Sequence, residues 1–189
     1  MGQTLNKMRV DSTILRTHCV FSAYPSCYTE LGALLRDEAK QTAGEPLQVK
    51  GDDLDAMRQL DTVECVNGDE VMKKIMSARS IDGKKMDVFL GVRPSEDAKL
   101  LAIECKLRVN AGKSLNEYAS LFNDICEKYW KARSVIGDTV PFVEDCYVLF
   151  ASKVYQLALR TLRNAKLEQS AYKVIRELTP EMLQKSLDY

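Results

Sequence analysis

The stretch that decides the fold runs from Asp87 to Lys106 and reads DVFLGV, then RPSEDAK, then LLAIECK. Two apolar runs flank a polar link that contains Pro94, which is typical of a β-hairpin with a longer loop. If the two strands pair antiparallel around residues 93–99, the start of the first lies beside the end of the second. The hairpin therefore places Asp87 near Glu104 and Lys106.

The second strand predicts one core face and one face that becomes charged. Side chains alternate along a strand, so one face carries Leu101, Ile103, Cys105, Leu107 and Val109, and the other Ala102, Glu104, Lys106 and Arg108. The apolar set should face the core. Two interpretations of the charged set stay open: an exposed Glu–Lys pair worth ~0–1 kcal/mol, or, with Asp87, a Mg²⁺ site in which Lys106 holds a water or offsets phosphoryl charge.

The composition predicts one globular domain over residues 1–189, because a chain that is 46% hydrophobic buries a substantial core at this length. Lys plus Arg and Asp plus Glu number 27 each, so the chain lacks the strongly basic charge typical of nucleic-acid-binding proteins. No signal peptide and no long apolar span is present, which predicts a soluble cytoplasmic protein that does not enter membranes.

Cysteine and histidine usage argues against several kinds of site. The six cysteines form no Cys-x-x-Cys pair, which favours reduced thiols in the cytosol. His18 is the single histidine, so multi-histidine metal sites are excluded and no motif supports a Ser/His triad. A zinc site formed by His18, Cys19 and Cys27 lacks any standard spacing.

Periodicity along the rest of the chain predicts an α/β fold with a small mixed central sheet of about four strands, flanked by helices. Residues 1–27 are ambiguous, and 63–66 reads as a connector. The predicted helices cover 28–42, a segment from Gly51, 69–78, 115–134, 152–168, 169–177 and a last one from Thr179. The predicted strands cover 78–81, 85–92, 100–109 and 145–151, with 47–50 as a strand or a loop, and Asp82-Gly83 as a hairpin turn. In the 115–134 helix, the apolar stripe includes Tyr118, Phe122, Tyr129 and Trp130.

This order of elements resembles the core of the PD-(D/E)XK nuclease-like (restriction-endonuclease-like) superfamily over about residues 65–151. The family pattern has an Asp on one strand and Glu/Asp-x-Lys on the next, which Asp87, Glu104 and Lys106 match. Met86 stands where the family usually has Pro. On this resemblance, residues 1–64 form an N-terminal helical part and 152–189 a set of C-terminal helices.

The resemblance implies that Asp87 and Glu104 bind Mg²⁺ or Mn²⁺, with the backbone carbonyl of Cys105 as a further ligand. Lys106 would position the hydrolytic water. An upstream acidic residue would be Glu70, with Glu38 as the alternative. The implied function is metal-dependent hydrolysis of phosphodiester bonds, with DNA favoured over RNA.

Two alternatives to a nuclease stay open. The first is a catalytically inactive nuclease-fold protein that binds or regulates as a subunit of a larger complex. The second is an unrelated α/β domain with a surface Glu–Lys pair. An active enzyme that cuts both strands of DNA would favour a homodimer.

Overall fold

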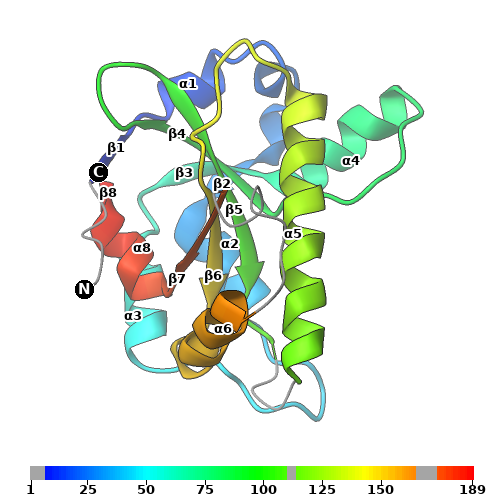
Figure 1. The fold of residues 1–189 in the computed structure, drawn as a ribbon. Helices are drawn as coiled ribbons and strands as arrows, with labels where there is room; N and C mark the ends of the chain where they lie inside the picture. Colours follow the sequence, from blue (N-terminus) through cyan, green and yellow to red (C-terminus); the bar gives the residue numbers. More distant parts are fainter. Residues whose placement is uncertain (1–6, 110–113, 165–173) are drawn as a thin grey trace.

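A mixed β-sheet with helices packed around it forms the molecule (Figure 1), and the computed structural model describes residues 7–109, 114–164 and 174–189. The strands are β1 (Met8–Val10), β2 (Tyr28–Glu30), β3 (Glu64–Asn67), β4 (Val88–Arg93), β5 (Lys99–Lys106), β6 (Cys146–Phe150), β7 (Ile175–Leu178) and β8 (Leu187–Asp188). The α-helices are α1 (Thr13–Arg16), α2 (Leu31–Glu38), α3 (Asp52–Gln59), α4 (Gly68–Ala78), α5 (Leu115–Ile136), α6 (Ser152–Asn164) and α8 (Pro180–Ser186).

The sheet changes from antiparallel to parallel pairing at β5. The strand order is β2-β3-β4-β5-β6-β7, and β1 joins the sheet through β4 and pairs with β8. Strands β2 to β5 pair antiparallel, whereas β5, β6 and β7 run parallel. Helix α5 makes the crossover between β5 and β6, as parallel neighbours require.

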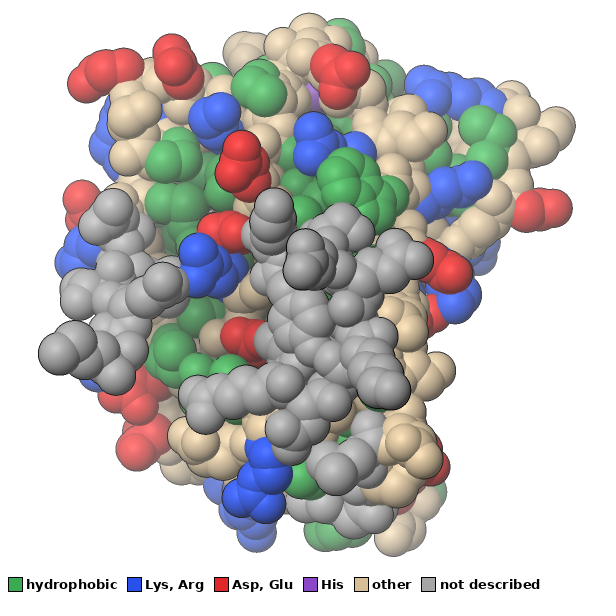
Figure 2. All heavy atoms as spheres, viewed as in Figure 1, with side chains coloured by type: hydrophobic (Ala, Val, Ile, Leu, Met, Phe, Trp, Pro, Cys, Tyr) green, Lys and Arg blue, Asp and Glu red, His purple; other side chains and the backbone are tan. Residues whose placement is uncertain are grey.

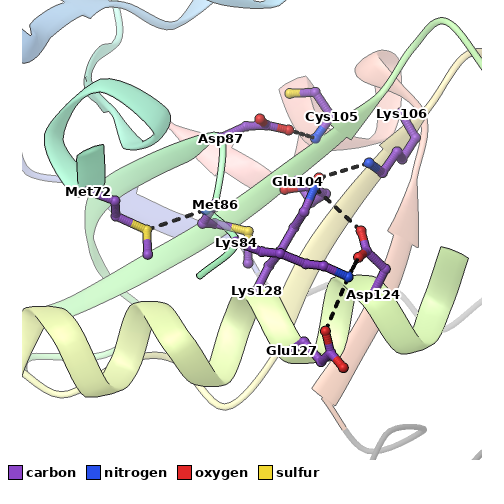
Figure 3. A network of polar contacts seen from close by, with 10 residues as sticks. All are labelled: Met72, Lys84, Met86, Asp87, Glu104, Cys105, Lys106, Asp124, Glu127 and Lys128. Carbon is purple, nitrogen blue, oxygen red and sulfur yellow. Dashed lines mark hydrogen bonds and ion pairs between the residues drawn. The ribbon is translucent and has the colours of Figure 1, made fainter. Parts of the chain in front are cut away.

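The predicted hairpin is confirmed. Strands β4 and β5 pair antiparallel with Val88 opposite Ile103 and Val92 opposite Lys99. Because the register extends one residue further back, Asp87 lies next to Glu104 at the end of the hairpin remote from its loop (Figure 3).

Helix α5 follows the prediction closely. Ser114 and Glu117 form a reciprocal capping box at its start, and Gly137, with φ of 86°, follows its last residue. Tyr118, Phe122 and Tyr129 are fully buried, as the apolar stripe predicts. Trp130 is 48% exposed, so its assignment to that stripe was wrong. It lies one residue, about 100°, round the helix from the buried Tyr129.

The predicted helix over 69–78 is confirmed as α4. The side chain of Asn67 caps it by accepting a hydrogen bond from the Glu70 amide at 3.1 Å. Gly68 lies tightly against the start of β4, where its amide donates to the Asp87 carbonyl at 2.8 Å.

The prediction of about four strands was too low, because the sheet has eight within the described residues. Residues 1–64 include β1, β2 and the first residue of β3, and the predicted 169–177 helix falls partly on β7, its 169–173 part lying outside the described residues. The missed strands span only two to four residues, too short to show an alternating pattern, and they form through partners distant in sequence.

Two other local predictions also fail. Residues 78–81 form no strand and Asp82-Gly83 closes no hairpin, because α4 extends to Ala78 and β4 starts only at Val88. Residues 47–50 form a loop, one of the two alternatives predicted.

Helices cover both faces of the central strands, with α5 in front of the sheet and α2 behind it in Figure 1. Every residue from Leu100 to Cys105 is buried, so Glu104 does not lie on an exposed sheet face, which was one of the two interpretations left open. In the described part of the chain, no helix combines the length and the apolar composition needed to cross a membrane.

Candidate active site at the ends of β4 and β5

Glu104 is a fully buried carboxylate held by two lysines. Its Oε1 lies 2.9 Å from Nζ of Lys106 on the same strand and 2.6 Å from Nζ of Lys128 on α5 (Figure 3). Its Oε2 is buried and has no hydrogen-bond partner among the described residues. The weak exposed pair is therefore excluded, because a charge without solvent contact requires close compensation.

Asp87 lies beside Glu104 and is held by the backbone of β5. Its Oδ2 accepts a hydrogen bond from the Cys105 amide at 2.7 Å. Burial, together with repulsion from Glu104 and more weakly from Glu38, raises the pKa of Asp87 to about 8. A cation that binds beside Asp87 would therefore stabilise the charged form of its carboxyl group.

An open cavity of about 360 Å³ lies at this end of the two strands. Its lining includes four acidic and three basic residues: Glu38, Glu45, Asp87, Glu104, Lys106, Arg108 and Lys128. The cavity therefore brings opposite charges around a space large enough for solvent and part of a substrate.

The structure brings Glu38, and not Glu70, to the cavity. Burial raises the pKa of Glu38 as its main influence, while Arg108 lowers it and Glu104 raises it, which places Glu38 in the same charged group. Glu70 instead lies 3.7 Å from Lys74 on α4, and Lys74 donates to Ser26 at 3.0 Å. Of the two upstream acids that the sequence allows, Glu38 is the one beside Asp87 and Glu104.

Cys105 contributes through its backbone rather than its sulfur. Burial raises the pKa of its thiol well above the ordinary value, so the sulfur stays protonated and is a poor metal ligand. The residue lines the cavity, and its amide orients Asp87.

Met86, the residue before Asp87, makes a contact that a proline at this position could not make. Its amide donates to Sδ of Met72 on α4 at 3.3 Å (Figure 3). Proline has no amide hydrogen and could not form this contact. The hydrogen bond to α4 therefore restrains the backbone at Met86, where a proline would do so through its fixed φ angle.

Lys128 is the site residue that the sequence analysis missed. It follows Asp124 by one turn of α5, and its Nζ lies 3.6 Å from Asp124 Oδ2. The available signal was a charged residue next to the buried Tyr129 in the helix. The sequence could not show what Lys128 contacts, because its partner Glu104 lies 24 positions away.

The described residues contain no group of three or more His, Cys, Asp and Glu side chains arranged to hold a metal ion. Mg²⁺ needs fewer protein ligands, because it is usually bound by one or two carboxylates plus waters and substrate phosphate. Asp87 and the unpartnered Oε2 of Glu104 fit that smaller requirement. His18, the single histidine, accepts a hydrogen bond from the Val20 amide on Nδ1 at 3.1 Å.

Comparison with models of known protein families, with curated proteins and with solved structures finds no match to this chain.

Proposed function

We propose that the chain is a Mg²⁺- or Mn²⁺-dependent nuclease that hydrolyses phosphodiester bonds in DNA, similar to the PD-(D/E)XK nuclease-like superfamily. One observation carries the proposal: Asp87, Glu104 and Lys106 meet at a cavity where a buried oxygen of Glu104 has no partner in the described part of the chain. A buried charged oxygen without a partner costs free energy that a bound cation would offset.

Each residue then has a defined task. Asp87, Glu104 and the main chain of Cys105 hold the ion, which when bound acts as a Lewis acid and lowers the pKa of its water. Lys106 orients the attacking water and offsets phosphate charge. The water oxygen bonds to phosphorus, the ester oxygen leaves and takes up a proton, and the water gives one up to solvent.

The order of elements supports the same proposal. The chain passes from Asp87 into strand β4 and then into strand β5, which carries Glu104 and Lys106. The long helix α5 and the buried strand β6 follow. The order on which the resemblance rests also has a helix and a short strand before these elements; α4 is that helix, and the short strand predicted over 78–81 is not formed. The pairing changes from antiparallel at β4–β5 to parallel at β5–β6.

DNA binding would depend on local groups of basic side chains, because acidic and basic side chains are interspersed across the face of the molecule that Figure 2 shows. Lys106 and Arg108 provide cationic groups at the cavity for phosphate contacts. Cleavage of both strands would favour a homodimer, and the six free cysteines suit the reducing cytoplasm.

A second candidate is an inactive protein of this fold that binds nucleic acid or regulates a larger complex. The favouring observation is that two lysine amines already compensate Glu104, while the raised pKa of Asp87 favours its neutral form near pH 7. The site would then need no metal ion for charge balance.

A cleavage assay separates the two candidates. Purified protein is incubated with Mn²⁺ and with single- and double-stranded DNA and RNA, beside Lys106→Ala and the exposed-surface control Lys73→Ala. We expect the wild type and Lys73→Ala to cleave DNA and Lys106→Ala to be slower by about 10²-fold or more. Cleavage that survives in Lys106→Ala, or no cleavage by the wild type, rules out the nuclease proposal.

A further inference from the structure

Two amines share one oxygen of Glu104, which is more positive charge than that carboxylate needs. Nζ of Lys106 lies 2.9 Å and Nζ of Lys128 lies 2.6 Å from Oε1. One ammonium suffices to neutralise one carboxylate. The second amine is therefore available for another task, and the surroundings of each lysine indicate which of the two remains in place.

A chain of ion pairs restrains the side chain of Lys128. Its Nζ lies 3.6 Å from Asp124 Oδ2, Asp124 Oδ1 contacts Nζ of Lys84, and Lys84 also lies 3.2 Å from Glu127 Oε2 (Figure 3). These contacts link α5 to the segment before β4. Lys128 therefore sits between two carboxylates that restrain its amine.

Lys106 has fewer ion-pair partners than Lys128 in the described part of the chain. It is the last residue of β5, it lines the cavity, and Glu104 is its one recorded ion-pair partner within residues 7–109, 114–164 and 174–189. Its flexible side chain can turn toward a substrate only if Glu104 keeps another counter-charge.

We propose that Lys128 is a positioning residue that holds Glu104 Oε1, so that Oε2 is left for a divalent cation and Lys106 is released toward the scissile phosphate. This inference rests on the proposed nuclease function. It assigns the two lysines different tasks: Lys128 orients the Glu104 carboxylate, and Lys106 acts on the substrate side.

The test compares Lys128→Met and Lys128→Arg with the wild type and with Lys73→Met, an exposed control on α4. Mn²⁺ affinity is measured by isothermal titration calorimetry, and DNA cleavage by single-turnover kinetics. Lys128→Met should bind Mn²⁺ about tenfold more tightly, because a positive charge beside the ion is removed. Its cleavage rate should fall by about 10²-fold, because Lys106 becomes the sole counter-charge of Glu104.

Lys128→Arg keeps the positive charge and should cleave DNA at most of the wild-type rate. This variant also allows the inference to be tested if Lys128→Met does not fold. Tighter binding together with slower cleavage is the signature of a positioning residue. Binding and rate equal to those of Lys73→Met would overturn the inference while the nuclease proposal stands. A loss of Mn²⁺ binding by both folded variants would likewise overturn it. If the wild type neither binds Mn²⁺ nor cleaves DNA, both proposals fall.

Discussion

At the scale of the residue, Asp87 is a carboxylate placed where its charge is costly. Burial is the main cause, and the neighbouring Glu104 adds repulsion. Asp87 nevertheless keeps a defined direction, because the Cys105 amide donates to it. An acid that is oriented but short of positive charge is suited to a cation.

Replacing Asp87 by Asn tests this directly. Asn retains an oxygen that can accept from the Cys105 amide but carries no charge. Without metal, we expect Asp87→Asn to be more stable than the wild type by on the order of 1–3 kcal/mol. Mn²⁺ should raise the melting temperature of the wild type by several degrees and leave that of Asp87→Asn unchanged, as followed by circular dichroism.

Asp97→Asn in the exposed hairpin loop is the matched control and should respond to Mn²⁺ as the wild type does. Equal Mn²⁺ shifts in Asp87→Asn and wild type would mean that the ion binds elsewhere.

His18 gives a pH dependence separate from the candidate site. It is 2% exposed, its Nδ1 accepts from Val20, and burial lowers its pKa below the ordinary 6.5. His18 therefore binds a proton more readily in the unfolded chain than in the folded one. The free energy of unfolding has its full value above about pH 6.5 and decreases as the pH falls below that value.

His18→Asn keeps an acceptor for the Val20 amide but cannot titrate. We expect the variant to lose less free energy of unfolding than the wild type between about pH 7.5 and about pH 5.5, as measured by urea denaturation. Asp87 and Glu38 titrate in both proteins, so their effects cancel in the difference. Parallel pH profiles would show that His18 is not the source.

At the scale of the element, the junction between α4 and β4 sets the position of Asp87. A Cβ atom on Gly68 would lie 2.4 Å from the Met86 carbonyl oxygen and 2.9 Å from the Asp87 carbonyl carbon. Both atoms belong to the backbone and cannot move without shifting the start of β4. Glycine is therefore required here by close approach.

Gly68→Ala should destabilise the fold by about 2 kcal/mol in urea denaturation, because the added methyl group forces the two elements apart. It should also reduce the Mn²⁺-induced rise in melting temperature, because Asp87 moves with the strand. Ser77→Ala, at an exposed position near the other end of α4, should change neither quantity. A wild-type response from Gly68→Ala would show that the junction does not set the site.

At the scale of the whole molecule, a buried acid joins two distant helices. Asp53 of α3 is 2% exposed and accepts from the Ser152 amide at 3.0 Å and from the Ser152 hydroxyl, at the first residue of α6. The carboxylate satisfies an amide that the helix itself leaves unpaired. It thereby connects the N-terminal part of the chain to the segment after β6.

Asp53→Ala should lower the free energy of unfolding by about 1–2 kcal/mol, because it removes the charged acceptor of the Ser152 amide and hydroxyl at the start of α6. Asp52→Ala, exposed in the same helical turn, should cost less than about 0.5 kcal/mol. Urea denaturation measures both, and equal losses would assign the effect to the start of α3 rather than to its contact with α6.

The sequence by itself determined the parts whose signal is local. The hairpin, the helices α4 and α5, and the apolar strand β6 follow from the periodicity of apolar residues along the chain. The meeting of Asp87 with Glu104 followed as well, because antiparallel pairing fixes which ends of a hairpin adjoin.

The tertiary structure decided everything that depends on residues distant in the chain. In the part of the chain that the structure describes, eight strands form one sheet. Helix α5 packs over Glu104 and brings Lys128 to it, and α2 places Glu38 at the cavity, whose lining does not include Glu70. The physical reason is that burial and charge compensation are set by packing between separate elements, which no local pattern records.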